Sequence, residues 1–286
     1  MRTFGHAVFA AAALAIFSAG AAHAHTPFIL PADFTPDDGA ASVNAAFASQ
    51  FFAPTIALDP NRFTALDPNG VSTPYTSVRI EQLAARLQFP LYDRGTYRLS
   101  SGEILGPVTQ MIAADGGWRA MAPGEVPPEG VQTNSLQTVT SADAYISRGR
   151  PNDTVLSAAS GRLAIQPITH PNRISVADGL TLQLNFDGAP FPNMPFVLYA
   201  SGDADTDVDT TFVTGADGRA VIRFPAAGQY VIAVRHRANA PAGSEAAVRS
   251  YTTTLTVEVF DVLPPMPPEV QEPRDRRRQR DNRSRL

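Results

Sequence analysis

The sequence ADGRAVIRFPAAGQYVIAVRH, from Ala216 to His236, is the stretch that most directly decides the fold class. Apolar residues occupy every second position in two short runs, Ala220-Ile222-Phe224 and Tyr230-Ile232-Val234. The segment Pro225–Gly228 separates the two runs. Period-two alternation interrupted by Gly and Pro is typical of antiparallel strands with one buried face. We therefore expect a half-buried β-hairpin here, with His236 at a sheet edge or loop mouth.

The same arrangement occurs a second time, earlier in the chain. Phe224-Pro225 followed by Gly228-x-Tyr230 matches Phe89-Pro90 followed by Gly95-x-Tyr97. A buried tyrosine at the start of a strand, with its hydroxyl bonded to a nearby turn, recurs in immunoglobulin-like sandwiches. Two such devices predict two tandem β-sandwich domains, which we place at residues 25–150 and 151–262.

Other parts of the chain also favour an all-β protein. Further strand-like runs are Ala41–Phe52, Leu180–Phe186, Phe196–Ala200 and Thr252–Phe260. The single tryptophan, Trp118, and the many phenylalanines are expected in the core, because large apolar side chains are usually buried. The chain has no cysteine, so no disulfide holds the fold together and no thiolate is available for metals or catalysis.

The two ends of the chain differ from the body. Residues 1–24 combine an early Arg2, an apolar run and the A-x-A sequence Ala22-His23-Ala24, which predicts a secretory signal peptide. We therefore expect export to the periplasm and a mature protein that begins at His25 and does not span the membrane. Residues 263–286 start with a Pro-rich linker and continue as an Arg-rich tail, which we expect to be disordered.

Charge is distributed unevenly along the sequence. The segment from residue 271 to the end holds seven Arg and three acidic residues, a net charge of +4. With Arg2 these positive charges account for +5, so residues 25–270 carry −9 of an overall −4. A strongly acidic body attracts cations and disfavours nucleic acid as a partner.

Familiar catalytic motifs are absent from the sequence. There is no G-x-S-x-G elbow, no H-E-x-x-H, no phosphate loop and no dinucleotide fingerprint. We therefore expect a protein that is not an enzyme. One catalytic alternative stays open, a copper-dependent oxidative enzyme built on an N-terminal histidine, and it requires a second histidine close by.

Three histidines remain in the expected mature chain: His25, His170 and His236. An N-terminal His25 offers an α-amino nitrogen and an imidazole that together chelate one metal. Such nitrogen donors suit nickel, cobalt, copper and zinc. If the two domains pack closely, His170 and His236 become candidate third and fourth ligands. The alternative is three unrelated surface or hydrogen-bonding histidines.

The loop Asp203-Ala-Asp205-Thr-Asp207-Val-Asp209 has the alternate carboxylates of a calcium loop. It lacks the glycine at the sixth position and the bidentate Glu that such loops need, because Val208 and Thr214 stand there. We interpret this segment as a solvated turn.

In the order of its motifs the chain resembles the bacterial periplasmic NikM-like proteins, a family of unknown function once described as the periplasmic component of nickel and cobalt uptake. The matching residues run from His25 to Val262 and are His25 after Ala24, Phe28–Pro31, Gly95-x-Tyr97, Leu163–Pro167, Asp187-Gly188-x-Pro190, Thr214–Ile222 and Gly228–Arg237. Some of these motifs are also similar to carboxypeptidase-regulatory-like sandwiches. The resemblance implies two β-sandwich domains, a periplasmic location, a role with transition metals and a membrane or outer-membrane transport component as partner.

The leading expectation is therefore a soluble periplasmic protein that binds a divalent transition metal and assists its uptake or handling. The alternative is a structural or adhesive β-sandwich module that binds a protein or glycan without metal. That alternative predicts scattered histidines and an exposed sheet edge or apolar patch.

Overall fold

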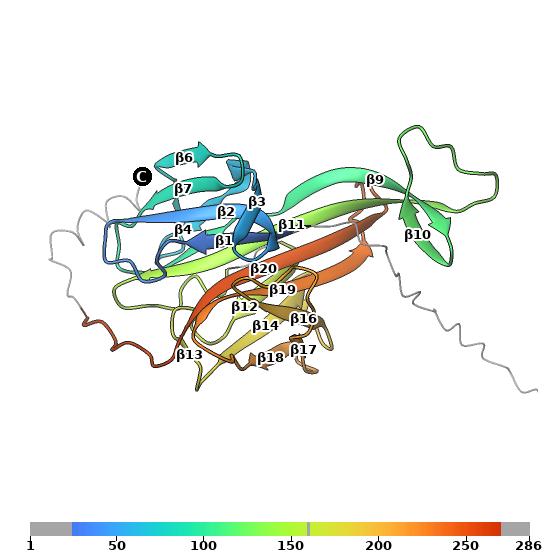
Figure 1. Ribbon diagram of the computed structural model, residues 1–286. Helices are drawn as coiled ribbons and strands as arrows, with labels where there is room; N and C mark the ends of the chain where they lie inside the picture. Colours follow the sequence, from blue (N-terminus) through green and yellow to red (C-terminus); the bar gives the residue numbers. More distant parts are fainter. Residues whose placement is uncertain (1–24, 159–160, 270–286) are drawn as a thin grey trace, which may run out of the picture.

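The computed structural model describes residues 25–158 and 161–269, and in these residues the protein is all-β (Figure 1). A 3₁₀ turn, η1 (Pro60–Arg62), is the one helical element among them. No helix in this part of the chain is long and apolar enough to cross a membrane. The predicted signal peptide and most of the predicted tail, residues 270–286, lie outside the described residues.

The strands form three sheets. The N-terminal sheet has the order β1-β2-β7-β6, with β3 also paired to β2. Its strands are β1 (Thr26–Pro31), β2 (Ala40–Gln50), β3 (Ala53–Ala57), β6 (Ser77–Ile80) and β7 (Ala85–Pro90). The third sheet contains β12 (Leu163–Pro167), β14 (Leu180–Phe186), β15 (Ala189–Pro190) and β18 (Arg219–Ile222).

The central sheet is the largest, and its main order is β17-β16-β19-β20-β11-β8-β4-β5. These strands are β4 (Thr64–Leu66), β5 (Ser72–Thr73), β8 (Gly95–Ser100), β11 (Thr133–Arg148), β16 (Pro195–Ala200), β17 (Thr211–Val213), β19 (Gly228–Asn239) and β20 (Val248–Phe260). Three more strands join at its margins, β9 (Ile104–Ala114), β10 (Gly117–Ala120) and β13 (Ile174–Ser175).

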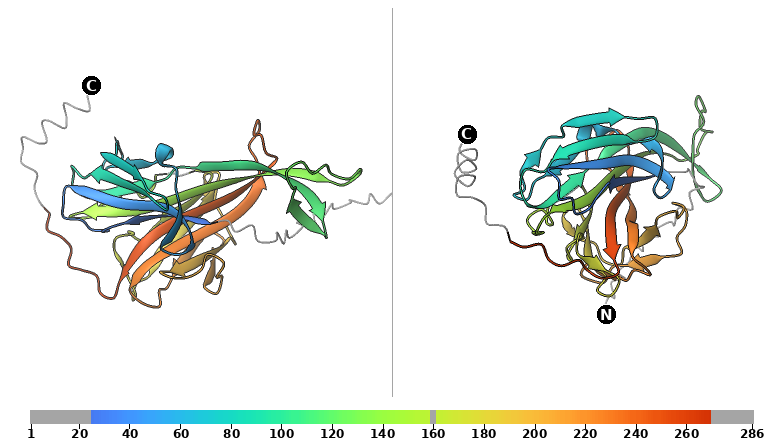
Figure 2. Two further views of the ribbon diagram at one scale, coloured as in Figure 1. Left: turned by 45° about the horizontal axis from the view of Figure 1, so that its top comes forward. Right: turned by 60° about the vertical axis from the view of Figure 1, so that its left-hand side comes forward.

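The central sheet lies between the other two (Figures 1 and 2). Alternate residues of its strands point to opposite faces. On β19, Ile232 and Val234 enter the core shared with the third sheet, whereas Val231 and Ala233 pack against β1 and β2 of the N-terminal sheet. We call these two sides the third-sheet face and the N-terminal-sheet face. Because β19 is buried on both, the expected half-buried strand is wrong here.

Two sandwich cores result from this layering. One core joins the N-terminal sheet to β8 and β11, with residues such as Val43, Leu87, Tyr97 and Ile146. The other joins the third sheet to β16, β19 and β20, with residues such as Leu182, Phe196, Ile232 and Leu255. The expectation of an all-β protein with two sandwich units is confirmed.

The hairpin predicted at Ala216–His236 is wrong, although both strands exist. β18 pairs with β14 in the third sheet, whereas β19 pairs with β16 and β20 in the central sheet. The break Pro225–Gly228 therefore carries the chain from one sheet to the opposite one. Alternation of apolar residues indicates that a segment is a strand and which of its faces is buried. It does not indicate the partner strand, and for this reason the predicted strands are correct and their predicted pairing is wrong.

Both predicted tyrosine corners are present. The Tyr97 hydroxyl donates to the Asp93 carbonyl at 2.9 Å, and the Tyr230 hydroxyl donates to the Ala226 carbonyl at 2.9 Å. Each tyrosine is buried in the core of its own sandwich. Tyr97 points to the N-terminal-sheet face and Tyr230 to the third-sheet face, so the two sandwiches are built on opposite sides of the same sheet.

The two sandwiches are joined by parallel pairing of β11 with β20, from Leu136–Val248 to Ala144–Thr256. Ser141 and Thr253 hydroxyls bond across this seam at 2.9 Å, and the Thr254 hydroxyl donates to the Pro27 carbonyl. The chain between β11 and β12, residues 149–162, has no strand in its described part. The boundary at 150/151 stays a prediction, because the central sheet runs through both halves.

A β-arm extends from the body (Figures 1 and 2). It consists of β9, β10, the beginning of β11 and the loop 121–132. Trp118 lies on β10, where it is partly exposed, so its expected place in a core is wrong. The sequence of β9, with Gly106-Pro107 inside it, does not alternate cleanly, and it gives no sign that the strands leave the body.

Candidate metal-binding histidines

His170 lies in a network of polar side chains at the start of β8. Its Nδ1 accepts a hydrogen bond from the Asn172 backbone N–H at 3.1 Å, and its Nε2 lies 2.8 Å from the Thr96 hydroxyl. Because Nδ1 accepts, Nε2 carries the proton and donates to Thr96. Thr96 in turn bonds the Ser147 hydroxyl, which donates to the Asn172 side chain at 2.7 Å.

Both ring nitrogens of His170 are therefore used within the protein. Burial lowers the pKa of His170, whereas the Asp153 charge and a hydrogen bond to the Asn152 backbone oppose this shift, and Arg173 adds a smaller lowering. A neutral imidazole suits the network, because a proton on Nδ1 would face the Asn172 N–H. His170 ties the loop between β12 and β13 to the Gly95–Tyr97 corner and has no nitrogen free for a metal.

His236 lies on the third-sheet face of β19, among aromatic rings. Its ring centroid is 4.8 Å from that of Phe186 and 4.8 Å from that of Phe191, each with edge-on geometry. Burial lowers its pKa, Arg162 lowers it further and Asp187 opposes the shift. Arg162 and Asp187 form a two-bonded ion pair beside it, with Nη2 to Oδ2 at 2.6 Å. In this environment the His236 ring packs against other rings as an aromatic side chain does.

His25 immediately precedes β1 and is partly exposed. Since Thr26 pairs with Ala48, His25 falls opposite Ser49, and its Nδ1 is 2.7 Å from the Ser49 hydroxyl. The Thr55 hydroxyl is 3.5 Å from the same nitrogen. The Ser49 hydroxyl can donate or accept, so its contact does not fix the tautomer of the ring, and the Thr55 hydroxyl donates to the Phe47 carbonyl at 2.9 Å. Within the described residues Nε2 has no hydrogen bond.

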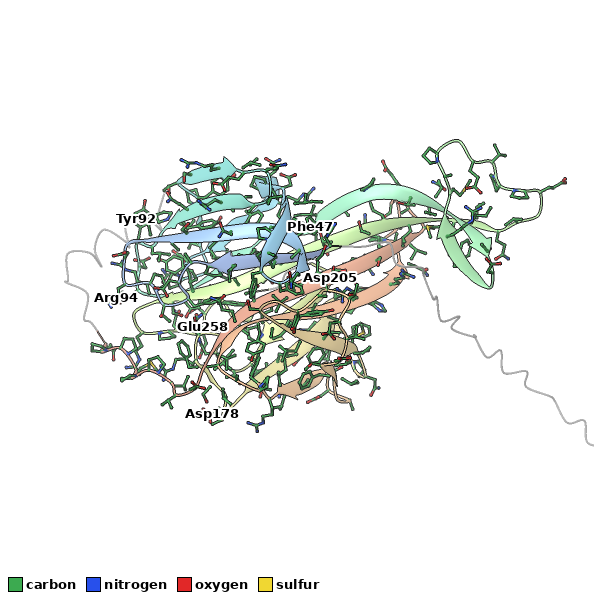
Figure 3. The ribbon with its side chains drawn as sticks, in the orientation of Figure 1. Phe47, Tyr92, Arg94, Asp178, Asp205 and Glu258 are labelled. Atoms are coloured by element: carbon green, nitrogen blue, oxygen red, sulfur yellow. The ribbon has the colours of Figure 1, made fainter. Side chains whose placement is uncertain are left out.

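The loop that carries Asp205 docks beside His25, on the end of β2 that contains Phe47 (Figure 3). The Asp205 N–H donates to the Ser49 carbonyl at 2.9 Å, and the Tyr199 hydroxyl donates to the Asp205 carbonyl at 3.0 Å. The Asp205 carboxylate is 3.5 Å from the Thr26 hydroxyl, which accepts from Arg235 Nη2 at 2.6 Å. The interpretation of 203–209 as a turn missed this position.

The three histidines do not share one site. His170 contacts Thr96, which pairs with Ser147 of β11. His236 pairs with Tyr251, which in turn pairs with Val139 of β11. Eight residues of β11, about 26 Å along the strand, therefore separate the positions of His170 and His236. His236 and its neighbour Arg235, which reaches Thr26 near His25, point to opposite faces of β19. Among the described residues no group of three or more His, Cys, Asp or Glu side chains is placed to hold a metal. The expected convergence of His25, His170 and His236 is not found.

Comparison with known proteins adds a family and two matches to solved structures. One match is the D0-D1 domain of intimin, at 10% identity and a TM-score of 0.22. The match covers 81% of this chain and 97% of that one. A second match is the N-terminal part of the bacterial S-layer protein SbsC, at 13% identity and a TM-score of 0.18, covering 82% of this chain and 44% of that one. No curated protein matches. The family model described as domain of unknown function DUF4198 matches residues 22–238, three quarters of the sequence, and the chain belongs to this family.

Proposed function

We propose that the protein binds a divalent transition metal in the periplasm, through the α-amine and imidazole of His25, and assists its uptake or handling. One observation supports this above the others: His25 is partly exposed beside β1, and within the described residues its Nε2 has no hydrogen bond and its Nδ1 lies against the Ser49 hydroxyl. His170 uses both nitrogens in its network, and His236 is packed against two phenylalanines that also contact each other.

The donor chemistry of the site fits such an ion. Cleavage after Ala24, as the sequence predicts, frees the α-amine of His25, and Nδ1 is the ring nitrogen that closes a chelate with it. The Ser49 hydroxyl stands beside Nδ1 and can turn toward or away from it, whereas the Thr55 hydroxyl donates to the Phe47 carbonyl at 2.9 Å. Amine and imidazole nitrogens favour Ni(II), Co(II), Cu(II) and Zn(II), and no thiolate is present to favour Cu(I).

Calorimetric titration of these four ions into protein with an authentic His25 terminus tests the proposal. The control protein carries one extra N-terminal residue, which removes the amine from the chelate and leaves every side chain in place. Tight binding to the authentic terminus and its loss in the control are expected. Affinity should also fall as the pH drops through the imidazole range near ~6.5, because protons compete for the ligand.

Three results would count against a site at His25. Equal affinity in the authentic and extended proteins would place binding elsewhere in the chain. An affinity that stays constant from pH 8 to pH 5 would exclude histidine as a ligand. Mass spectrometry of the exported protein, showing an N-terminus other than His25, would remove the amine from the proposal.

The β-arm favours a second function, a module that binds a partner macromolecule without metal. Val126 at its tip is 83% exposed, and among the described residues β10 pairs with β9 alone, which leaves one strand edge open. Arg119 fixes the tip by two bonds to Glu125, whose pKa these bonds and the Ala122 N–H lower to about 2. The separated histidines also agree with this alternative. Absence of metal binding in both titrated proteins would favour it.

A further inference from the structure

We propose that Asp205 supplies a carboxylate ligand to the His25 metal site, so that one bound ion joins the first half of the chain to the second. This inference rests on the function proposed above and adds a ligand that neither the family match nor the spacing of the histidines indicates. The contacts that bring the 203–209 loop to β1 and β2 support this role of Asp205.

The backbone of Asp205 is fixed next to the site from both sides. Its N–H donates to Ser49, whose hydroxyl lies against the His25 ring, and its carbonyl accepts from Tyr199 on β16. The loop is held again where Phe51 N–H donates to the Asp203 carbonyl at 2.9 Å, and where Gly202 N–H donates to Phe51. These hydrogen bonds therefore hold the backbone of Asp205 in a fixed position against β2 and β16.

The side chain of Asp205, by contrast, is weakly engaged. Within the described residues its single hydrogen bond is the 3.5 Å contact from the Thr26 hydroxyl. Asp203 differs, because its carboxylate accepts from the Ala200 N–H at 2.7 Å, and Asp207 differs, because its carboxylate accepts from the Asp209 N–H at 3.0 Å. Of these three carboxylates, that of Asp205 is the one nearest β1 and the one free to turn toward a cation.

The Asp205 carboxylate also balances a positive charge next to the site. Arg235 donates to Thr26 and lies within 3.5 Å of the Asp205 carbonyl, so a positive guanidinium stands close to the N-terminus. A divalent ion at His25 alone would be repelled by that charge. The Asp205 carboxylate offsets it and adds an oxygen donor to two nitrogens, a mixed set that borderline divalent ions accept.

Asp205→Asn is the direct test, because the amide keeps the size and the backbone bonds of Asp205 and removes its charge. Asp207→Asn is the matched control, since it makes the same change in the same loop on an exposed side chain. With Ni(II) and Cu(II) as probes, we expect Asp205→Asn to lower the affinity about 10-fold to 100-fold, at least as much as loss of an outer-shell partner does. Asp207→Asn should bind like the wild type.

Thermal unfolding provides a second readout. An ion held by both halves should raise the Tm of the wild-type protein, because a ligand bound to the folded state stabilises it, and should raise the Tm of Asp205→Asn less at the same Ni(II) concentration. Equal Tm values of the two proteins without metal would show that the variant is folded.

The possible failures separate the two proposals. Wild-type affinity in Asp205→Asn, together with loss of binding in the N-terminally extended protein, would overturn the role of Asp205 and keep the His25 site. Equal weakening by Asp205→Asn and Asp207→Asn would reduce Asp205 to general attraction by the acidic loop and would overturn its role as a ligand. Equal binding by authentic and extended proteins would overturn both proposals.

Discussion

The first half of the protein (residues 25–150) and the second (residues 151–262) place the same tyrosine corner against different surroundings. Over β19 and β20 the third-sheet face of the central sheet is apolar, with Ile232, Val234 and Leu255 packed on β14. Over β8 and β11 the same face is polar and buried. Its polar side chains include Thr96, Arg98, Asp143 and Ser147, and Tyr145 of β11 joins the apolar core of the third sheet.

The difference comes from what covers each region. A second sheet supplies apolar side chains over β19 and β20, whereas residues 149–162 and the loop between β12 and β13 supply backbone and polar groups over β8 and β11. Arg98 donates to the Ala158 carbonyl, and Asn152 and His170 reach Thr96. A non-strand segment has unpaired backbone groups, so a surface that buries it needs polar partners. The first corner thereby depends on residues of the second half.

The largest expected effect distinguishes the buried polar face from exposed ion pairs. Arg98 and Asp143 form an ion pair at 2.9 Å whose side chains are 4% and 3% exposed. Asp143→Ala leaves a buried guanidinium without its counter-charge and should lower the free energy of unfolding by about 3–5 kcal/mol. Asp187→Ala, which breaks the more exposed pair with Arg162, should lower it by about 0.2–1 kcal/mol.

Urea unfolding followed by circular dichroism measures both variants. Equal losses for Asp143→Ala and Asp187→Ala would contradict a distinct buried polar face in the first half.

The second test compares the two corner glycines. Gly95 and Gly228 both have positive φ, +129° and +149°, and both stand two residues before the corner tyrosine. A Cβ on Gly95 would lie 2.6 Å from Pro68 Cβ and 2.9 Å from Asn152 Oδ1, whereas a Cβ on Gly228 would meet Tyr230 Cε2 at 3.9 Å. Gly95→Ala combines backbone strain with overpacking and should cost about 3 kcal/mol, and Gly228→Ala about 1 kcal/mol from strain alone.

The same unfolding experiment applies to this pair. If Gly228→Ala proves as costly as Gly95→Ala, backbone strain dominates and the crowding around the first corner has no energetic weight.

The smallest effect concerns pH. Burial lowers the pKa of His170, so the unfolded chain binds the proton more readily than the folded protein does. The stability that the neutral ring contributes is complete above the unfolded pKa of ~6.5 and is lost as the pH falls below it. His236, whose pKa is also lowered by burial, adds a second contribution of the same sign.

The slope of unfolding free energy against pH, measured below pH 6.5, should become smaller in His170→Gln, which keeps the His236 contribution. An unchanged slope would show that protonation of His170 does not disturb the Thr96 network. The slope is the relevant quantity, because His170→Gln also changes the stability at neutral pH.

The candidate site was predictable in part. His25 was singled out because its position after a predicted cleavage site gives it a special pair of nitrogens. The sequence did not indicate Asp205, because nothing distinguishes its carboxylate from those of other polar turns and because Ser49, which it contacts, is distant in sequence. The single signal available was an acidic loop following the strand Phe196–Ala200, and nothing in the sequence states where that loop docks.

What the sequence alone determined is local. Period-two alternation fixed which residues are strand residues, and Gly-x-Tyr fixed both tyrosine corners, because these depend on backbone conformation within a few residues. Strand pairing, the layering of three sheets and the separation of His25, His170 and His236 were decided by the tertiary structure. The two runs of Ala216–His236 entered different sheets because pairing satisfies backbone hydrogen bonds with whichever edge the packed core brings near, and no pattern within one strand encodes that edge.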